Sequence, residues 1–450
     1  MKKDWLNDSN AALDKAAHLA DLAKSVGADI SEAVFSYARE SGVTYRDGEV
    51  TELEQAESLE LSLRVWVGDR VAYLAGNQID KHGLRDLAEQ AVSRAKLLPP
   101  SASVTLPDEP DTPTRSNEVD PSEPSLTEII SSATYLYEQC MRRSGITNSD
   151  GGQVGWSKGR NALVSSNGLS VSRANSRFQR GISVLAGNTS NQVRSFDYST
   201  ATHLEDLIDL DSIIDRATSK ALAKVGAAPI ESFIGDVIFD APMAKSIVGG
   251  FLGGINGSAV AKGQSFLKDK MEERIFPPEV QILDDPTLRR GLSSRSIDRE
   301  GHVPNKLDLV KKGVLKNWLL DRRSAAMLGL ATNGRAVHAG GGTIMPTASN
   351  VLVSGGKGSQ TDLISKVERG LLVTDMMGSG LNPLTGDYSR GAEGFLIEDG
   401  KLGVPVQSMT IAGSMMEIFS SCHLGGDLDQ NGSMHCPSIF VPGLQIAGRG

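Results

Sequence analysis

The sequence predicts an α+β protein in which helix-strand-helix modules precede a large, mixed and mainly antiparallel C-terminal domain. Two apolar repeats at the start of the chain support this prediction. Apolar and polar side chains alternate over residues 59–73, which is typical of half-buried strands, whereas residues 13–23 and 84–95 repeat apolar side chains at helical spacing. From about residue 235 onward, short strand-like runs lack the regular strand-helix rhythm of a doubly wound parallel sheet.

Length and composition narrow the class of protein. A chain of 450 residues suits two or three domains, because single hydrophobic cores stop growing at roughly 250 to 300 residues. Its net charge of -9, without long basic runs, disfavours direct nucleic-acid binding. Three cysteines, an odd number, fit a reducing compartment rather than a disulfide framework. Since Asp4 and Asp8 interrupt the N-terminal segment and no apolar run approaches about 18 residues, we expect no signal peptide, no membrane span and a cytoplasmic location.

Residues 1–98 are predicted to form an N-terminal α/β module. A helix is expected over residues 8–27, between a polar start and a glycine. Two strands should follow and meet at a tight turn at residues 68–69. A second helix is expected from about Asp80.

Residues 99–124 hold seven of the 18 prolines and predict a linker, because proline sustains neither a helix nor a central strand. The central module, residues 125–230, repeats the order of the first. It should contain a helix with an apolar face from Leu126 to Cys140, short strands such as LSVSRA and GISVLAG, and a closing helix with an apolar face from Leu210 to Ala221. The repeated order suggests a duplication as an architectural hypothesis.

Residues 231–450 are predicted to form one C-terminal domain. Glycine-rich turns separate the strand-like runs VIFD, VQIL, LDLV, VLVSGG and FLIEDG, and helices are expected at residues 242–256 and 362–370. The glycines at 249, 250, 253 and 254 are more typical of close packing than of ligand binding.

The sequence contains neither a P-loop nor the nucleophile motif of serine hydrolases. The nearest P-loop candidate, residues 354–360, lacks glycines at the required positions, and no Gly-x-Ser-x-Gly elbow occurs. Asp298 and Glu300 could serve as an acid/base pair or bind a cation, although solvated turn carboxylates that position a loop are commoner.

A zinc site is conceivable near the C-terminus, where two cysteines and two histidines bracket a loop. Adjacent Cys-His pairs on a strand point to opposite faces, whereas zinc sites usually place paired ligands two to four residues apart. A structural role is therefore favoured. An independent hydrolase remains a minor alternative, and it would use Cys422, His423, His435 and Cys436.

The stretch LNPLTGDYSRGAEGFLIEDGK, residues 381–401, combines many glycines with a Thr-Gly-Asp sequence. In a tight turn Asp387 could accept hydrogen bonds from backbone amides, and Arg390 could present its guanidinium to a peptide carboxylate or carbonyl. A purely structural, glycine-rich hairpin accounts for the pattern equally well. The candidate substrate-contact or partner-contact residues are Asn382, Thr385, Gly386, Asp387 and Arg390.

Extended to residue 415, this stretch resembles the C-terminal signature of the TldD/PmbA family, whose members are labelled modulators of DNA gyrase. The motifs GQSFLKDKMEERIF, RSIDREG and CPSIFVPGLQIAG carry the resemblance over most of residues 235–450. The family pairs two homologous subunits, and in one of them a His-Glu-x-x-x-His helix and a C-terminal cysteine hold zinc. Here residues 243–263 contain no His or Glu, and Cys436 directly precedes Pro437. The resemblance is therefore to the PmbA, or TldE, branch, which lacks the zinc motif.

This resemblance implies the non-metal subunit of a heteromeric cytoplasmic metallopeptidase that degrades or matures unfolded peptides. No catalytic residue and no metal are expected on this chain, and zinc is expected on the partner. That partner would be a zinc-bearing TldD-type homologue in a heterodimer, or a second copy of this chain. Residues 382–390 would shape a cleft wall or subunit contact that holds an extended peptide by strand addition. The alternative is a catalytically inactive peptide-binding or scaffold protein of the same fold.

Overall fold

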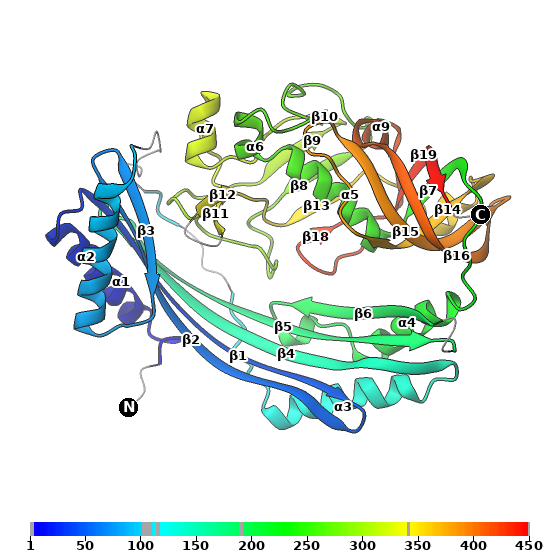
Figure 1. The fold of residues 1–450 in the computed structure, drawn as a ribbon, viewed down its shortest axis with the longest axis horizontal. Helices are drawn as coiled ribbons and strands as arrows, with labels where there is room; N and C mark the ends of the chain where they lie inside the picture. The colour runs from blue at the N-terminus through cyan, green and yellow to red at the C-terminus, as the bar shows by residue number, and fades with distance from the viewer. Residues whose placement is uncertain (1–3, 101–109, 114–117, 189–191, 340–342, 449–450) are drawn as a thin grey trace.

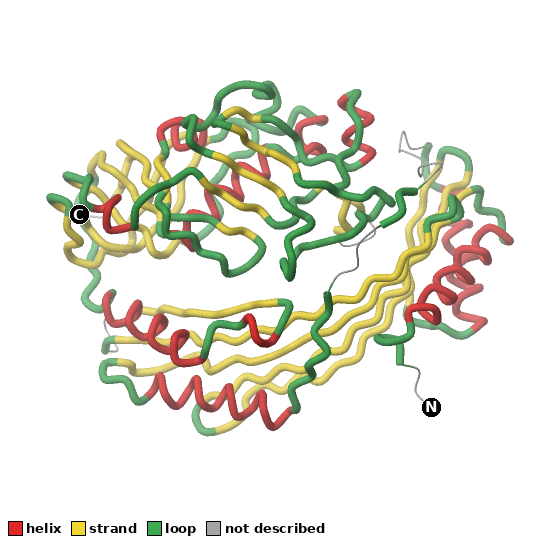
Figure 2. The backbone as a smooth tube through the Cα atoms, turned by 180° about the vertical axis from the view of Figure 1, so that it is seen from behind, coloured by secondary structure: helices red, strands yellow, loops and turns green. Residues whose placement is uncertain are grey.

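The computed structural model describes residues 4–100, 110–113, 118–188, 192–339 and 343–448 (Figure 1). A long, curved sheet carries helices on one face, and the C-terminal unit lies over the other face (Figures 1 and 2). Together with the mainly antiparallel strand pairing, this arrangement confirms the predicted α+β class.

The curved sheet is built equally from the first two predicted modules. Neighbouring strands are all antiparallel, and β1 at the centre joins the two modules by pairing with both β2 and β4. In spatial order the strands are β3 (Arg70–Gly76), β2 (Glu49–Val67), β1 (Ile30–Arg46), β4 (Ile146–Ser165), β5 (Ser170–Ala186) and β6 (Val193–Ala201). The two modules predicted at residues 1–98 and 125–230 therefore each supply half of one continuous sheet.

Odd-numbered and even-numbered side chains of β1 point to opposite faces of the curved sheet. Its odd-numbered side chains Phe35 and Val43 lie in the helix-covered cores, whereas Val34 packs with Ile297 of the C-terminal unit. Asp or Ser caps the start of each covering α-helix by accepting backbone hydrogen bonds. These helices are α1 (Ser9–Ser25), α2 (Lys81–Leu97), α3 (Leu126–Met141) and α4 (Leu210–Ala223), and a 3-10 turn, η1 (Leu204–Asp206), precedes α4.

All four predicted helices of this half are confirmed, as is the turn at residues 68–69. The strands are longer than predicted, because the runs LSVSRA and GISVLAG belong to the single strand β5. Strand β1 was not predicted at all. Its central residues, such as Arg39 and Glu40, are only half-buried and polar, so they interrupt the apolar alternation that marks a strand.

The C-terminal unit contains two larger sheets and a hairpin. One sheet runs β16-β15-β14-β7-β19-β17 with an extra β16–β19 pairing, the second runs β10-β9-β8-β13-β18, and β11 pairs with β12. Its strands are β7 (Phe233–Phe239), β8 (Gln281–Asp284), β9 (Leu307–Lys311), β10 (Val314–Leu315), β11 (Ala336–Ala339), β12 (Thr343–Pro346), β13 (Val351–Ser354), β14 (Arg369–Met377), β15 (Asp387–Glu398), β16 (Lys401–Ser414), β17 (His423–Leu424), β18 (Met434–His435) and β19 (Ile439–Ala447). Its helices are α5 (Ala241–Gly254), α6 (Gly257–Ala261), α7 (Arg322–Leu328), α8 (Gln360–Ile364) and α9 (Met415–Ser421).

The five predicted strand runs and the helix at residues 242–256 are confirmed in this unit. The helix predicted over residues 362–370 is wrong beyond Ile364, because Arg369–Met377 forms β14 beside β7. Gly370 permits this, since a Cβ there would collide with the Asp236 carbonyl oxygen of the neighbouring strand. Within the described residues, no helix is long and apolar enough to span a bilayer.

Contacts at both ends of the curved sheet help to hold the C-terminal unit over it. At one end Arg299 pairs with the buried Glu32 of β1 at 3.4 Å, and Arg173 of β5 donates to the Asp298 carbonyl oxygen at 3.1 Å. At the other end Lys224, just after α4, pairs with Asp375 of β14. The predicted linker, residues 99–124, lies partly outside the described residues. Its described part after residue 110 has no helix or strand.

Candidate functional site

Helix α5 stands where the resemblance places the zinc motif of the metal-bearing subunit. Its residues include no His, Cys, Asp or Glu. A Cβ at Gly250 would lie 2.9 Å from Met415 and 3.2 Å from Leu381, and one at Gly254 would lie 2.7 Å from Leu267. Close packing is thus confirmed for these two glycines. It is wrong for Gly249 and Gly253, which are exposed and face open space.

The predicted Thr-Gly-Asp turn lies beside α5, because Leu381 contacts the helix at Gly250 and the Phe266 amide donates to the Pro383 carbonyl oxygen at 2.9 Å. The Asp387 carboxylate accepts from the Thr385 hydroxyl at 2.6 Å rather than from backbone amides. That capping role belongs to the Asn382 side chain, whose oxygen accepts from the Leu384 amide at 3.0 Å.

Gly386 supplies the backbone geometry of this turn. Its φ of 79° lies in the left-handed region, and its amide donates to the Asn382 carbonyl oxygen at 2.9 Å. The Asn382, Thr385 and Asp387 side chains are exposed around it. Four of the five predicted site residues are therefore brought together in one solvent-facing turn.

Arg390 lies further along β15 and is half-buried. Its Nε atom is buried without a hydrogen-bond partner among the described residues. The neighbouring Tyr388 is buried, with its hydroxyl 3.3 Å from the Met376 sulfur, and burial raises its pKa. Arg390 is therefore less exposed to solvent than Asn382, Thr385 and Asp387 in the turn.

Asp298 and Glu300 lie on the loop between β8 and β9, and both are buried rather than solvated as predicted. The Asp298 carboxylate accepts from the Glu300 and His302 amides at 2.8 and 2.9 Å, and Glu300 accepts from the Arg322 amide at 2.8 Å. These bonds confirm the loop-positioning role. Burial, assisted by the nearby Asp298 and Asp321 carboxylates, raises the pKa of Glu300 to about 8.

The four Cys and His residues of the conceivable zinc site face different surroundings. Burial raises the pKa of both the Cys422 and the Cys436 thiol to about 12. His423 is exposed and lies 4.0 Å from Glu279, whereas burial beside Lys245 lowers the pKa of His435. In the part of the chain that the structure describes, no three His, Cys, Asp or Glu side chains are grouped to hold a metal ion.

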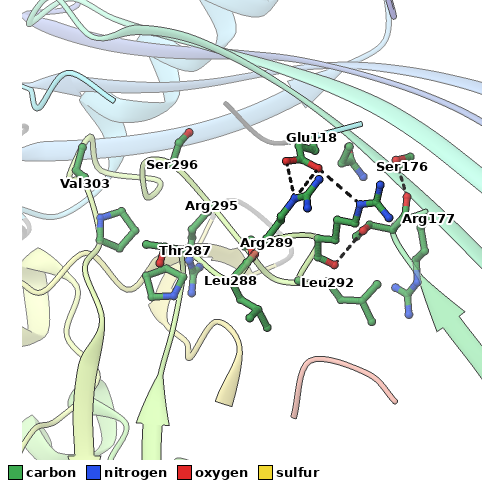
Figure 3. Close-up of a pocket in the computed structure, with 17 residues that line it drawn as sticks. Glu118, Ser176, Arg177, Thr287, Leu288, Arg289, Leu292, Arg295, Ser296 and Val303 are labelled. Carbon is green, nitrogen blue, oxygen red and sulfur yellow. Dashed lines mark hydrogen bonds and ion pairs between the residues drawn. The ribbon is translucent and has the colours of Figure 1, made fainter. Parts of the chain in front are cut away.

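A cavity lies elsewhere, between β5 and the loop that follows β8 (Figure 3). A cavity of about 440 Å³ is lined by Arg177 of β5 and by Arg289, Arg290 and Arg295 of the loop. Glu118 pairs with Arg289 at 3.0 Å across this cavity (Figure 3). Sequence reasoning missed this cluster because its arginines come from distant segments, and only the Arg289-Arg290 pair is adjacent in the chain.

Comparison with known proteins matches the chain to three domains along its length. Residues 31–95, 119–225 and 234–448 match PmbA/TldA metallopeptidase domain 1, central domain and C-terminal domain, respectively. The metalloprotease PmbA of Escherichia coli O157:H7 is 27% identical over 442 residues, covering 97% of this chain and 96% of that protein.

Solved structures share the whole fold. A proposed modulator of DNA gyrase from Bacteroides thetaiotaomicron superimposes with a TM-score of 0.90 at 23% identity, covering 99% of this chain and 100% of the other. TldE from Thermococcus kodakarensis superimposes with a TM-score of 0.86 at 22% identity, covering 96% and 100%.

Proposed function

Because the chain belongs to the PmbA/TldD metallopeptidase family, we propose that it is the non-metal subunit of a heteromeric cytoplasmic peptidase that degrades or matures unfolded peptides. The zinc would reside on a TldD-type homologous partner, where it would polarise the scissile carbonyl and activate water. This chain would contribute to the walls of the peptide-binding cleft and to the subunit contact.

The observation that carries this proposal is the chemistry of α5. Zinc in proteins is held by Cys, His, Asp or Glu side chains, and residues 241–254 offer none. The exposed face of α5 carries Gly249 and Gly253 instead. The residues present do not fit zinc, so no catalytic step is assigned to a metal on this chain.

The turn beside α5 supplies the proposed contact residues. Asn382, Thr385 and Asp387 are exposed there, and the side chain of Leu384 at the tip is 59% exposed. Gly386 would act by fixing the turn geometry. Arg390, with one buried nitrogen unbonded within the described structure, would act from the strand behind. A peptide or a partner subunit could cover this surface without disturbing the hydrogen bonds inside the turn.

The test is hydrolysis of an unstructured peptide by the purified chain alone and mixed with its zinc-bearing homologue, each with and without a chelator and with zinc quantified. Activity that requires the mixture and is abolished by chelation, with no zinc on this chain, supports the proposal. Chelator-sensitive hydrolysis and stoichiometric zinc in the isolated chain would overturn it. Peptide binding with no activity in either sample would favour the inactive binding or scaffold protein.

A further inference from the structure

Over most of its length, the outer side of β2 is paired with no strand of the described structure. Strand β3 pairs with β2 only from Leu61 to Val67, whereas β1 pairs with β2 from Glu49 to Trp66. Residues 49–60 therefore border the curved sheet, on the side away from β6 and from the C-terminal unit (Figures 1 and 2). Because alternate N–H and C=O groups of a strand point to each side, half of the backbone groups in this stretch point away from β1.

Residues 52–56 form the regular part of this border, and we call them the β2 edge. Apart from the ladder with β1, no backbone group of these five residues bonds to a described residue. Leu6, Asp111 and Asp120, which stand near undescribed segments of the chain, bond to β4, the C-terminal unit and β5, respectively. Strand β1 lies between β2 and both β4 and β5, so these residues are remote from the β2 edge.

Acidic and apolar side chains alternate at the start of the β2 edge. Leu53 pairs with Val43, which lies in a helix-covered core, so Glu52 and Glu54 point to the opposite face. All three side chains of the β2 edge named here are exposed, Leu53 to 52%. A Cβ at Gly42, which pairs with Glu54, would meet no atom within 4 Å, so the face beside Glu54 is open.

The negative charge of the β2 edge is not neutralised within the described structure. Glu54 forms no ion pair with a described residue, and Glu52 accepts from a neutral hydroxyl of β1 at 2.9 Å. The two arginines of β1, Arg39 and Arg46, each pair with another carboxylate. Residues 49–63 include no Lys or Arg. The carboxylates at this strand edge are therefore available to cations from outside the chain.

We infer that the β2 edge binds an extended partner segment in which a basic, an apolar and a basic residue follow one another. The segment adds as a strand beside residues 52–56 and bonds to their outward backbone groups. Its two cations lie beside Glu52 and Glu54, and its apolar side chain covers Leu53, because neighbouring strands present side chains to the same two faces with the same period. The unpaired edge calls for a strand, and the charge pattern selects a basic one.

A second copy of this chain does not fit the β2 edge. Antiparallel pairing of two copies, centred on any residue from 52 to 54, places glutamate opposite glutamate, and like charges directly opposite each other destabilise a sheet. The net charge of -9 adds repulsion between copies. The occupant is therefore a basic segment of a different molecule.

The test is fluorescence anisotropy with the full chain and labelled seven-residue peptides that are N-acetylated and C-terminally amidated. One peptide carries a lysine on each side of a valine, one has the same composition with the lysines three positions apart, and one has glutamine in place of lysine. The alternating peptide should bind about fivefold tighter than the glutamine peptide, as expected for two exposed ion pairs, and the three-spaced peptide should fall between them.

Glu52→Gln combined with Glu54→Gln should remove this preference. Glu231→Gln, which removes an exposed carboxylate between α4 and β7, is the matched control and should leave the preference unchanged. Equal affinity for the three peptides, or an equal loss with Glu231→Gln, would overturn the inference.

Hydrogen exchange followed by mass spectrometry locates the bound peptide. Binding of the alternating peptide should slow amide exchange within residues 49–60, and slowing at β6 or in the C-terminal unit alone would overturn the inference. N-methylation at alternate peptide amides should weaken binding in one phase only, and equal effects in both phases would argue against strand addition.

Charged side chains also protect strand edges from association, and this role makes a different prediction. If Glu52 and Glu54 only protect the edge, none of the peptides binds, and Glu52→Val combined with Glu54→Val converts the chain to oligomers in light scattering. That pair of results would overturn the inference. The peptide hydrolysis assay of the two-subunit mixture tests the proposed function separately, so either idea can fail alone.

Discussion

The glycine-rich turn and the groove between β5 and the loop that follows β8, which Arg177, Arg289, Arg290 and Arg295 line, differ in how their polar groups are arranged. In the turn, Thr385 bonds to Asp387, the Asn382 amide donates to the Asp387 carbonyl oxygen, and the Ser389 amide donates to the Gly380 carbonyl oxygen. In the groove, Arg177 donates to the neutral Thr200 hydroxyl and, among the described residues, pairs with no carboxylate. One region satisfies its own polar groups over a few neighbouring residues, whereas the other gathers several cations around a cavity.

This difference shows that an unusual sequence motif does not by itself mark a binding surface. Glycines and a Thr-Gly-Asp sequence attract attention because they are unusual, yet here several of them serve backbone packing. The groove is built from ordinary Arg, Asn and Ser residues on a strand, which attract none. Unmet hydrogen-bonding capacity next to a cavity is the better guide to a binding surface.

The largest expected effect on stability comes from a substitution in the glycine-rich turn, whose polar groups bond to one another. A Cβ at Gly380 would collide with the Ser389 carbonyl oxygen, so Gly380→Ala must push the turn away from β15. We expect a loss of about 3 kcal/mol in the free energy of unfolding, measured by urea titration.

Gly391→Ala is the matched control, because the nearest atom to its new Cβ is the Met377 Cβ at 3.5 Å, an ordinary contact. Its effect should stay below about 1 kcal/mol. Equal losses for the two variants would show that close backbone approach is not what Gly380 provides.

The next effect is pH-dependent and concerns the loop that carries Arg295 into the groove. Burial raises the pKa of Glu300 to about 8, from its ordinary value of 4.5. Between these values the folded protein keeps a proton that the unfolded chain releases, so stability falls as the pH rises. From pH 6 to pH 8 this group should cost about 2 kcal/mol. Glu300→Gln should remove that dependence, measured as the difference in unfolding free energy between the two pH values.

Asp240 is a second group whose pKa is raised by burial, to about 7, and it lies between β7 and α5. It therefore serves as an internal control for this experiment. Its contribution is common to the wild type and Glu300→Gln and cancels in their difference. An unchanged pH dependence in Glu300→Gln would mean that Glu300 is already ionised in the folded protein at pH 6.

Sequence reasoning predicted the helices well because their apolar faces and capping residues are local signals. It missed β1, whose polar centre breaks the alternation, and it extended α8 into β14, whose pairing with β7 is not local. It also gave no sign of the buried Arg335, which donates to Asp284 at 2.6 Å across 51 residues. The groove escaped for the same reason, since its walls come from β5 and from a loop more than a hundred residues later.

A smaller effect is expected at the tip of the turn. Thr385→Val removes the hydroxyl that donates to Asp387, but the site is exposed and water can replace the bond. The loss should be about 0.5 to 1 kcal/mol in unfolding free energy. Ser389→Ala, on the neighbouring exposed position, is the control and should have no measurable effect. A loss above about 2 kcal/mol for Thr385→Val would mean that the turn is held by its side chains rather than by its backbone.

The smallest effect on stability is expected for Arg177→Gln, which removes one of the cations that line the groove. Arg177 is exposed, and its hydrogen bond to Thr200 involves a neutral partner, so little folding energy depends on its charge. Its unfolding free energy should stay within about 0.5 kcal/mol of the wild type. A large destabilisation would show that Arg177, like the residues of the turn, has a structural role.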